Sequence, residues 1–259
     1  MDLKLAGRTV LVTGASKGIG LAIAQWFARE GCHLRLAARS KDLLEREAAG
    51  IRKNHSIDVQ VFGLDLSQDT GRKNLTDACP EVDILINNAG DIPAGAIDDV
   101  DDSAWRAGWD LKVFGYVGLT RHYLAKMKAR GRGVIINIIG AAGERPIPTY
   151  VAGSMGNAGL MSMTLALGAV SPEHGVRVLG VNPGPVLTDR VAKISRKRAK
   201  AILGDEERYP ELLKKNPFGR PATVDEIAAS VVFLASDLSS YTSGTIVTID
   251  GGMSKRAAA

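Results

Sequence analysis

A glycine-rich segment near the start of the chain carries the first chemistry that the residues allow. It runs from Thr13 to Gly20, between a short apolar run and a helical pattern. A glycine turn between a strand and a helix lets backbone N–H groups approach a pyrophosphate, which side chains would otherwise block. The segment therefore predicts a dinucleotide-binding turn rather than an ordinary tight turn. Its candidate contacts are Gly14, Ser16, Lys17, Gly18, Ile19 and Gly20.

The type of dinucleotide depends on the end of the second predicted strand. An acidic residue there would accept hydrogen bonds from the ribose 2′-OH and repel a 2′-phosphate. Ala38 occupies this position, Arg39 follows it, and Lys17 adds a second cation. Two cations without a carboxylate suit a dianionic phosphate, so we expect NADP(H) rather than NAD(H). The alternative is that both cations are ordinary surface charges.

Four motifs occur in order along almost the whole chain. They are Thr13-Gly-x-x-x-Gly-x-Gly20, Asn87-Asn88-Ala89-Gly90, Asn182-Pro183-Gly184-Pro185-Val186 and a closing segment from Gly244 to Gly252 that ends in Asp250-Gly251-Gly252. Together they resemble the short-chain dehydrogenase/reductase family, over about residues 5 to 253. The resemblance implies an oxidoreductase that uses a nicotinamide cofactor on a carbonyl or alcohol.

The resemblance also implies cofactor contacts at matching positions. Asp65, next to Leu66, corresponds to the aspartate that binds the adenine amine. Asn88, Ala89 and Gly90 correspond to the segment beside the adenine ribose, although Asn88 has the alternative role of tying strands together. The segment that holds the nicotinamide carboxamide corresponds to Pro183, Gly184, Val186 and Thr188. A site that has lost its function, with these as plain loop residues, is the other interpretation.

The family's catalytic residues are replaced in this chain. The family uses a tyrosine, a lysine four residues later, a serine and an asparagine, and the phenol needs a nearby cation because its ordinary pKa is ~10. Alignment on Pro146 and on Ala158-Gly159-Leu160 places these groups at Gly153, Asn157, Gly140 and Lys112, in that order. All four positions depart from the family pattern.

Two of the four replacements are reciprocal. The family has asparagine on the central helix and lysine on the next, whereas this chain has Lys112 on the first and Asn157 on the second. If the two side chains face one another, the ammonium is kept but comes from the other helix, and Asn157 is left to bind it or the ribose. The alternative is drift, with Lys112 extending to solvent along its aliphatic stem.

Other ionisable or hydroxylic residues near these positions are poor substitutes. Tyr150 lies three residues early, and its i+4 partner is Ser154, which has no charge to stabilise a phenolate. We therefore expect Tyr150 to be a packing residue. We also expect Glu144, Ser154 and His122 to be surface or packing residues.

Alternating apolar runs and helical patterns predict a single α/β domain over residues 1–259, with a doubly wound, Rossmann-type parallel sheet of about seven strands. Expected strands are 9–12, 33–37, 59–64, 84–86, 133–138, 176–181 and 245–249. Expected helices are 19–30, 41–54, 71–78, 104–128, 151–170 and 224–235. Residues 189–216 form a basic excursion that we expect to be a substrate lid.

Composition narrows the class of protein. The formal charge is +5, and several cations are concentrated between Arg190 and Lys200, which fits a solvated helix face or an anionic substrate better than nucleic acid. Cys32 and Cys79 have no metal-ligand spacing, so no metal site is expected. No apolar run approaches the roughly 20 residues that span a bilayer, so we expect a cytoplasmic protein. Family resemblance implies a homotetramer or dimer built through the helices near 104–128 and 151–170.

Three functions remain open from the sequence. The first is an NADP(H)-dependent oxidoreductase with an unusual proton-transfer site, in which Lys112 and Asn157 take part. The second is a catalytically silent cofactor-binding or regulatory protein on the same fold. The third is a non-redox enzyme that uses Lys112 as a base.

Overall fold

The computed structural model describes residues 2–256, without the side chains of Arg190 and Lys197. It contains a seven-stranded sheet in the order β3-β2-β1-β4-β5-β6-β7, in which every pairing is parallel. The strands are β1 (Thr9–Thr13), β2 (His33–Ala38), β3 (Val59–Gly63), β4 (Ile84–Asn87), β5 (Gly133–Ile138), β6 (Val176–Pro183) and β7 (Ile246–Ile249). The predicted fold class is confirmed.

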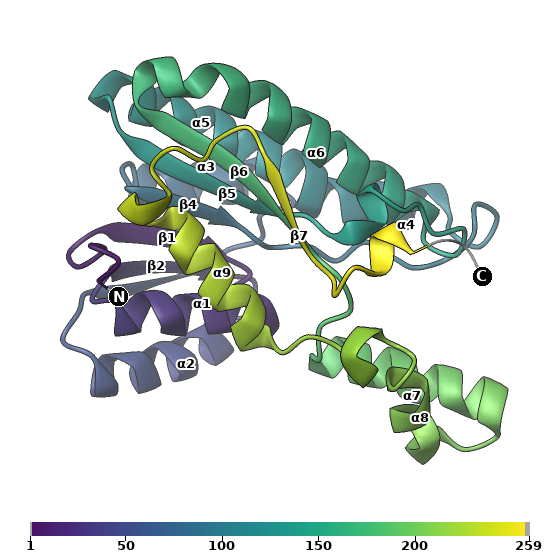
Figure 1. Cartoon of the computed structure of the whole chain (residues 1–259). Helices are drawn as coiled ribbons and strands as arrows, with labels where there is room; N and C mark the ends of the chain where they lie inside the picture. The colour runs from purple at the N-terminus through teal and green to yellow at the C-terminus, as the bar shows by residue number, and fades with distance from the viewer. Residues whose placement is uncertain (1, 257–259) are drawn as a thin grey trace.

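Helices cover both faces of the sheet, as parallel crossovers require. The helices α1, α2 and α9 lie on one face and α3, α5 and α6 on the other (Figure 1). The longer helices are α1 (Gly18–Arg29), α2 (Lys41–Asn54), α3 (Asp69–Ala78), α4 (Asp102–Trp109), α5 (Gly115–Arg130), α6 (Val151–Val170), α7 (Asp189–Leu203) and α9 (Val224–Ala235). The strand order reverses between β1 and β4, and in doubly wound sheets ligands bind in the crevice outside the carboxyl ends of the strands at such a switch point.

The core consists of apolar side chains from both faces of the central strands. Val10 and Val12 of β1 belong to the cluster under α1 and α9, whereas Leu11 belongs to the cluster under α3 and α5. This alternation follows from the two-residue period of a strand. Cys32 and Cys79 are buried free thiols within these clusters, at a helix-to-strand turn and a helix end as expected.

The expected helix over 104–128 is interrupted. The structure has α4, then a π-helical turn η1 (Asp110–Phe114), then α5. Residues 104–128 contain no proline, so the sequence does not mark this interruption. A π turn inserts one extra residue per turn and frequently occurs at functional sites.

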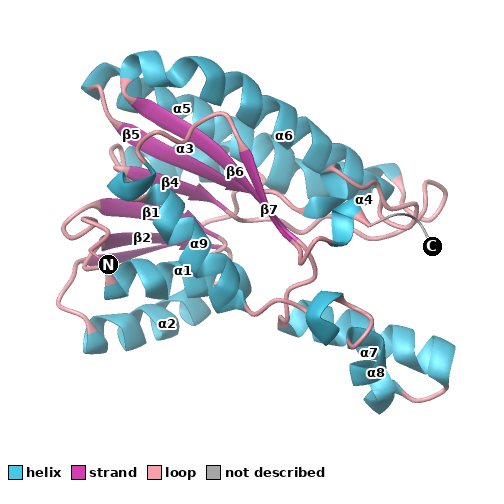
Figure 2. Ribbon diagram, viewed as in Figure 1, coloured by secondary structure: helices cyan, strands magenta, loops and turns pink. Residues whose placement is uncertain are grey.

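Residues 189–216 leave the body of the molecule. Figure 2 shows α7 and α8 (Tyr209–Leu213) as a helical pair that projects away from the sheet. Arg196 forms an ion pair with Glu207 and stacks over the ring of Tyr209, 4.6 Å from its centroid. One cation of the basic run is therefore held inside the pair, while Lys193, Arg198 and Lys200 are exposed.

Across residues 2–256, none of the helices is long and apolar enough to cross a membrane. The same residues contain no group of three or more His, Cys, Asp or Glu side chains placed to hold a metal ion.

Candidate active site

The glycine turn is shaped by close backbone packing. Gly14 has φ +66°, and a Cβ there would lie 2.9 Å from Cα of Ala89. A Cβ at Gly20 would collide with the carbonyl oxygen of Gly14 and with the amide of Asn88. Helix α1 begins at Gly18, so its unpaired N–H groups face the opening. These residues fit a bound pyrophosphate, because backbone donors line the cradle and no side chain fills it.

Asn88 ties the turn to the neighbouring strand. Its Nδ2 donates to the carbonyl oxygens of Thr13 at 3.0 Å and Gly14 at 3.3 Å. The Thr13 hydroxyl accepts from the backbone N–H groups of Asn88 and Ala89. The strand-tying role, one of the two alternatives for Asn88, is thus present in the structure.

The segment after β6 closes the other side of the crevice. A Cβ at Gly184 would lie 2.7 Å from Cβ of Asp250, so glycine is needed for this approach. Val186 is buried, and the Thr188 hydroxyl accepts from the Val191 N–H to cap α7. A Cβ at Gly18 would stand 3.5 Å from Cγ2 of Thr188, which brings the glycine turn and the 183–188 segment together.

The predicted adenine end lies at the ends of β2 and β3. Burial raises the pKa of Asp65, but hydrogen bonds from the Ser67 hydroxyl and N–H outweigh it and leave the pKa below its usual value. Leu66 beside it is buried. Arg39 forms an ion pair of 3.6 Å with Asp91, and both side chains are more than half exposed.

Lys112 comes from the π turn and points into the fold. Its Nζ donates to the carbonyl oxygen of Ile139 at 2.5 Å, immediately after β5. A Cβ at Gly90 would lie 2.9 Å from Cδ of Lys112, so the aliphatic stem crosses the end of the 87–90 motif. The ammonium therefore sits inside the crevice and does not extend to solvent.

Asn157 reaches the next carbonyl along the chain. It is 2% exposed, and its Nδ2 donates to the carbonyl oxygen of Gly140 at 3.3 Å. Its Oδ1 is buried without a hydrogen-bond partner among the described residues. Gly140 has φ +133°, and a Cβ there would lie 2.9 Å from Asn157 Nδ2, so both backbone and space favour glycine. Lys112 and Asn157 thus converge on adjacent carbonyls from different helices.

A buried polar ladder holds those helices in register with the strands. Asn87 Nδ2 donates to Thr120 Oγ1 at 3.0 Å and to Asn137 Oδ1 at 2.9 Å. Asn137 Nδ2 donates in turn to Thr164 Oγ1 at 2.9 Å. The ladder links β4 and β5 to α5 and α6, which carry or flank the site.

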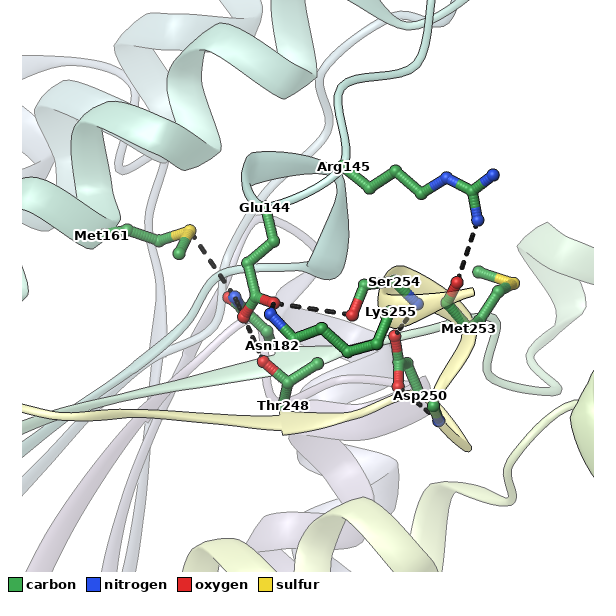
Figure 3. Close-up of polar contacts among 10 residues, drawn as sticks. Glu144, Arg145, Met161, Asn182, Thr248, Asp250, Met253, Ser254 and Lys255 are labelled. Carbon is green, nitrogen blue, oxygen red and sulfur yellow. Dashed lines mark hydrogen bonds and ion pairs between the residues drawn. The ribbon is translucent and has the colours of Figure 1, made fainter. Parts of the chain in front are cut away.

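Glu144 is the functional candidate that sequence reasoning missed. Instead of lying at the surface, its carboxylate accepts from Thr248, from Asn182 Nδ2 at 3.1 Å and from Lys255 Nζ at 2.9 Å (Figure 3). Asn182 also accepts the N–H of Gly140 at 3.2 Å. This Glu144 cluster, defined as Glu144, Asn182, Thr248, Ser254 and Lys255, connects the C-terminal segment to Gly140. The available signal was an acidic residue shortly after the fifth strand, where the family residues lie.

The cluster makes stability depend on pH. The hydrogen bond from Thr248, with further help from Lys255 and Asn182, holds the pKa of Glu144 below its usual 4.5 despite partial burial. A lowered folded pKa contributes stability above the unfolded value that is lost as pH falls through the folded value. We expect the wild-type unfolding free energy to drop between about pH 5 and pH 3, and Glu144→Gln to remove part of that drop. Urea denaturation across this range measures it.

Exposed Glu173 supplies the control for this experiment. Glu173→Gln should leave the pH profile of unfolding as in the wild type. A Glu144→Gln profile parallel to wild type would contradict the role assigned to the cluster.

Two other neighbours match their expected packing roles. Ser154 is buried and accepts the N–H of Ile147 at 3.0 Å. The His122 ring packs edge-on against Tyr123, with centroids 5.0 Å apart.

Comparison with known proteins supports the family that the sequence motifs predicted. Residues 14–254 match the family model described as Enoyl-(Acyl carrier protein) reductase. The chain belongs to the short-chain dehydrogenase/reductase family and is an oxidoreductase of that family, as the sequence motifs predicted.

Particular relatives show how far the likeness extends. The chain is 32% identical to "Uncharacterized oxidoreductase YvrD" of Bacillus subtilis, over 98% of each chain. It is 31% identical to L-sorbose reductase of Gluconobacter frateurii complexed with NADPH and L-sorbose, with a TM-score of 0.93 over 99% of this chain and 100% of that one. A putative NAD(P)-dependent gluconate 5-dehydrogenase from Beutenbergia cavernae, with bound NADP, is 30% identical, with a TM-score of 0.87 over 99% and 100% of the two chains. A nicotinamide-cofactor site is therefore part of this fold.

Proposed function

We propose that this protein is an NADPH-dependent reductase of a small carbonyl compound. The observation that carries the choice of cofactor is the end of β2, where Ala38 is buried and Arg39 lies exposed beside the crevice. The exposed ion pair of Arg39 with Asp91 contributes little stability, so the guanidinium is available to a 2′-phosphate at small cost. Exposed Lys17, at the N-cap of α1, adds a second cation.

The remaining predicted contacts are assigned along the crevice. Backbone groups of the glycine turn would hold the pyrophosphate, Asp65 and the 88–90 segment the adenosine, and the 183–188 segment the nicotinamide. The buried Oδ1 of Asn157 lacks a donor among the described residues and suits a ribose hydroxyl. Asn157 thus keeps a cofactor-binding role at its position on α6.

Lys112 supplies the positive charge at the reacting end. Bound NADPH would deliver a hydride to the carbonyl carbon of the substrate. The Lys112 ammonium, held at Ile139 O, stabilises the negative charge that develops as the carbonyl oxygen is converted to an alcohol. The Gly140 N–H is already donated to Asn182, so the Glu144 cluster positions this segment and does not contact substrate.

Two further parts of the chain are assigned to substrate access and to assembly of the oligomer. We propose that residues 189–216 form the substrate lid, since α7 starts directly after Thr188, which lies beside Gly18, and the exposed cations of α7 suit an anionic substrate. We also propose a cytoplasmic homo-oligomer, tetramer or dimer, that assembles through α5 and α6. Exposed Leu165 and Val170 on α6 fit such a contact.

Cofactor binding tests the proposal directly. We expect NADPH to bind more tightly than NADH, and the double variant Lys17→Ala/Arg39→Ala to weaken NADPH binding by roughly a hundredfold, about tenfold for each charge-assisted contact. NADH binding should change little. Fluorescence titration of the purified protein measures both affinities, and Lys53→Ala, an exposed cation on α2, is the control.

The results of this titration and of activity assays distinguish among the three functions that the sequence left open. Equal loss of NADH and NADPH affinity would contradict the 2′-phosphate assignment, and no binding of either nucleotide would overturn the proposal. Tight binding without turnover across a carbonyl panel headed by L-sorbose would favour a silent cofactor-binding protein. Turnover without a change in nicotinamide absorbance would favour non-redox chemistry at Lys112.

A further inference from the structure

The ring of Tyr150 occupies the space above Gly153. A Cβ built at Gly153 would fall inside this ring, and the nearest ring atom is Cζ, which bears the hydroxyl. Gly153 is the position at which sequence alignment places the family's tyrosine. The ring of a tyrosine one turn earlier therefore overlies this position of the helix.

The local backbone explains why Tyr150 lies in this way. Tyr150 is the N-cap of α6, with φ −150° and ψ 45°, and its carbonyl accepts the N–H of Ser154. Its own N–H donates to Ile147, and an isolated bridge pairs it with Gly95. Residues three apart lie on one face of a helix, so a ring at 150 lies over position 153 only when that position has no side chain.

The elements packed against this end of α6 carry a cation and a second phenol. The N–H of the Trp109 indole donates to the carbonyl of Ala152 at 2.9 Å, which joins α4 to the start of α6. The next residues of that segment form η1 and carry Lys112 to Ile139 O. One helical turn later, the Tyr116 hydroxyl donates to the adjacent carbonyl of Ile138 at 2.9 Å. Lys112 of η1 and Tyr116 of α5 thus reach adjacent carbonyls at the end of β5.

Tyr116 is unsuited to proton transfer. Complete burial raises the pKa of its phenol far above the usual value, and negative charge on Tyr150 would raise it further. Tyr150 is the other phenol at this end of α6, and the segment that carries Lys112 is joined to the same end of α6 through Trp109.

We propose that Tyr150 is the proton donor of the reduction and that Lys112, from the neighbouring helix, stabilises its phenolate. In this step bound NADPH would supply the hydride for the new C–H bond, and the carbonyl π electrons would move onto oxygen. That oxygen takes the proton of the Tyr150 hydroxyl as the O–H bond of tyrosine breaks. Water returns a proton to the phenolate before the next turnover. The assignment rests on the proposed function and adds the residue that the sequence left unidentified.

The expectation that Tyr150 serves only for packing is replaced by this proposal. Its basis was that the i+4 residue, Ser154, has no charge. Tertiary structure supplies the charge from η1 instead, and Ser154 is engaged with Ile147.

Ultraviolet titration of tyrosinate tests the pair without a substrate. The protein has five tyrosines, of which Tyr116 and Tyr123 are buried with raised pKa values, whereas Tyr241 is fully exposed. We expect one tyrosine to ionise below the ordinary phenol pKa of ~10. Tyr150→Phe, which keeps the ring over Gly153, should remove that transition, and Lys112→Met should move it to higher pH. Tyr241→Phe is the control and should leave it in place.

The opposite results would overturn the proposal. These are a wild-type protein in which no tyrosine ionises below pH ~10, an early transition that survives Tyr150→Phe, or one that Lys112→Met does not move. NADPH titration of Tyr150→Phe shows whether the proton-donor assignment or the proposed cofactor-dependent function has failed. The variant should bind NADPH as the wild type does, so a loss of NADPH binding would count against the proposed function. With a reducible substrate, Tyr150→Phe should lower kcat at least a hundredfold with KM little changed.

Discussion

Lys112→Met is expected to lower the rate of carbonyl reduction about a thousandfold, within the range typical of groups that assist proton transfer. Methionine keeps the stem that crosses Gly90 but removes the ammonium at Ile139 O. Negative charge that develops in the crevice would then lose its stabilising cation. The rate of NADPH oxidation with saturating substrate measures the loss.

Two controls accompany this experiment: the NADPH affinity of Lys112→Met and the activity of a variant at a second lysine. NADPH binding by Lys112→Met should remain close to wild type, because the assigned phosphate contacts lie at the other end of the crevice. Lys126→Met, on the exposed side of α5, should reduce substrate at the wild-type rate. A Lys112→Met enzyme that retained wild-type turnover would remove Lys112 from the mechanism.

Gly153→Ala should destabilise the protein by about 1–3 kcal/mol, the usual cost of forcing an extra methyl group into a filled space. The added Cβ would overlap the ring of Tyr150, which must move. Gly159→Ala in the same helix is the matched control, because its Cβ would meet nothing within 4 Å. Alanine is a better helix former than glycine, so Gly159→Ala should stabilise the protein by about 0.5–1 kcal/mol. Urea denaturation gives both values.

A double-mutant cycle tests whether overlap with the Tyr150 ring causes the loss of stability in Gly153→Ala. In a Tyr150→Ala background the ring is absent, so Gly153→Ala should cost far less than in the wild type. Similar effects of Gly153→Ala and Gly159→Ala in the wild type would contradict the position assigned to the ring. Gly153→Ala should also lower the rate of carbonyl reduction, since it displaces the proposed proton donor.

Local patterns were sufficient for most elements of the fold. The expected helices 41–54, 151–170 and 224–235 coincide with α2, α6 and α9, and the strand at 133–138 coincides with β5. Helix α9 carries a full capping box between Thr223 and Glu226, which marks its start in the sequence. These signals lie within a few residues of one another and require no knowledge of distant contacts.

The π turn shows where local patterns fail. The sequence predicts a single helix through residues 104–128, but the structure inserts η1 at Asp110–Phe114 and so directs Lys112 inward. The reason is tertiary, because Trp109 is fixed to α6 and Tyr116 to β5 on either side of the turn. A hydrophobic pattern does not record such constraints.

Neighbouring residues encode the glycine turns and the strand ends, and these local signals were enough to predict the family and the parallel sheet. The sequence also located the replaced positions at Gly140, Gly153, Asn157 and Lys112. Packing of the helices on the sheet placed the ring of Tyr150 over Gly153, brought Lys112 and Asn157 to adjacent carbonyls and gave Glu144 its distant hydrogen-bond partners. These contacts join residues from separate elements, and their geometry arises only when the helices pack on the sheet.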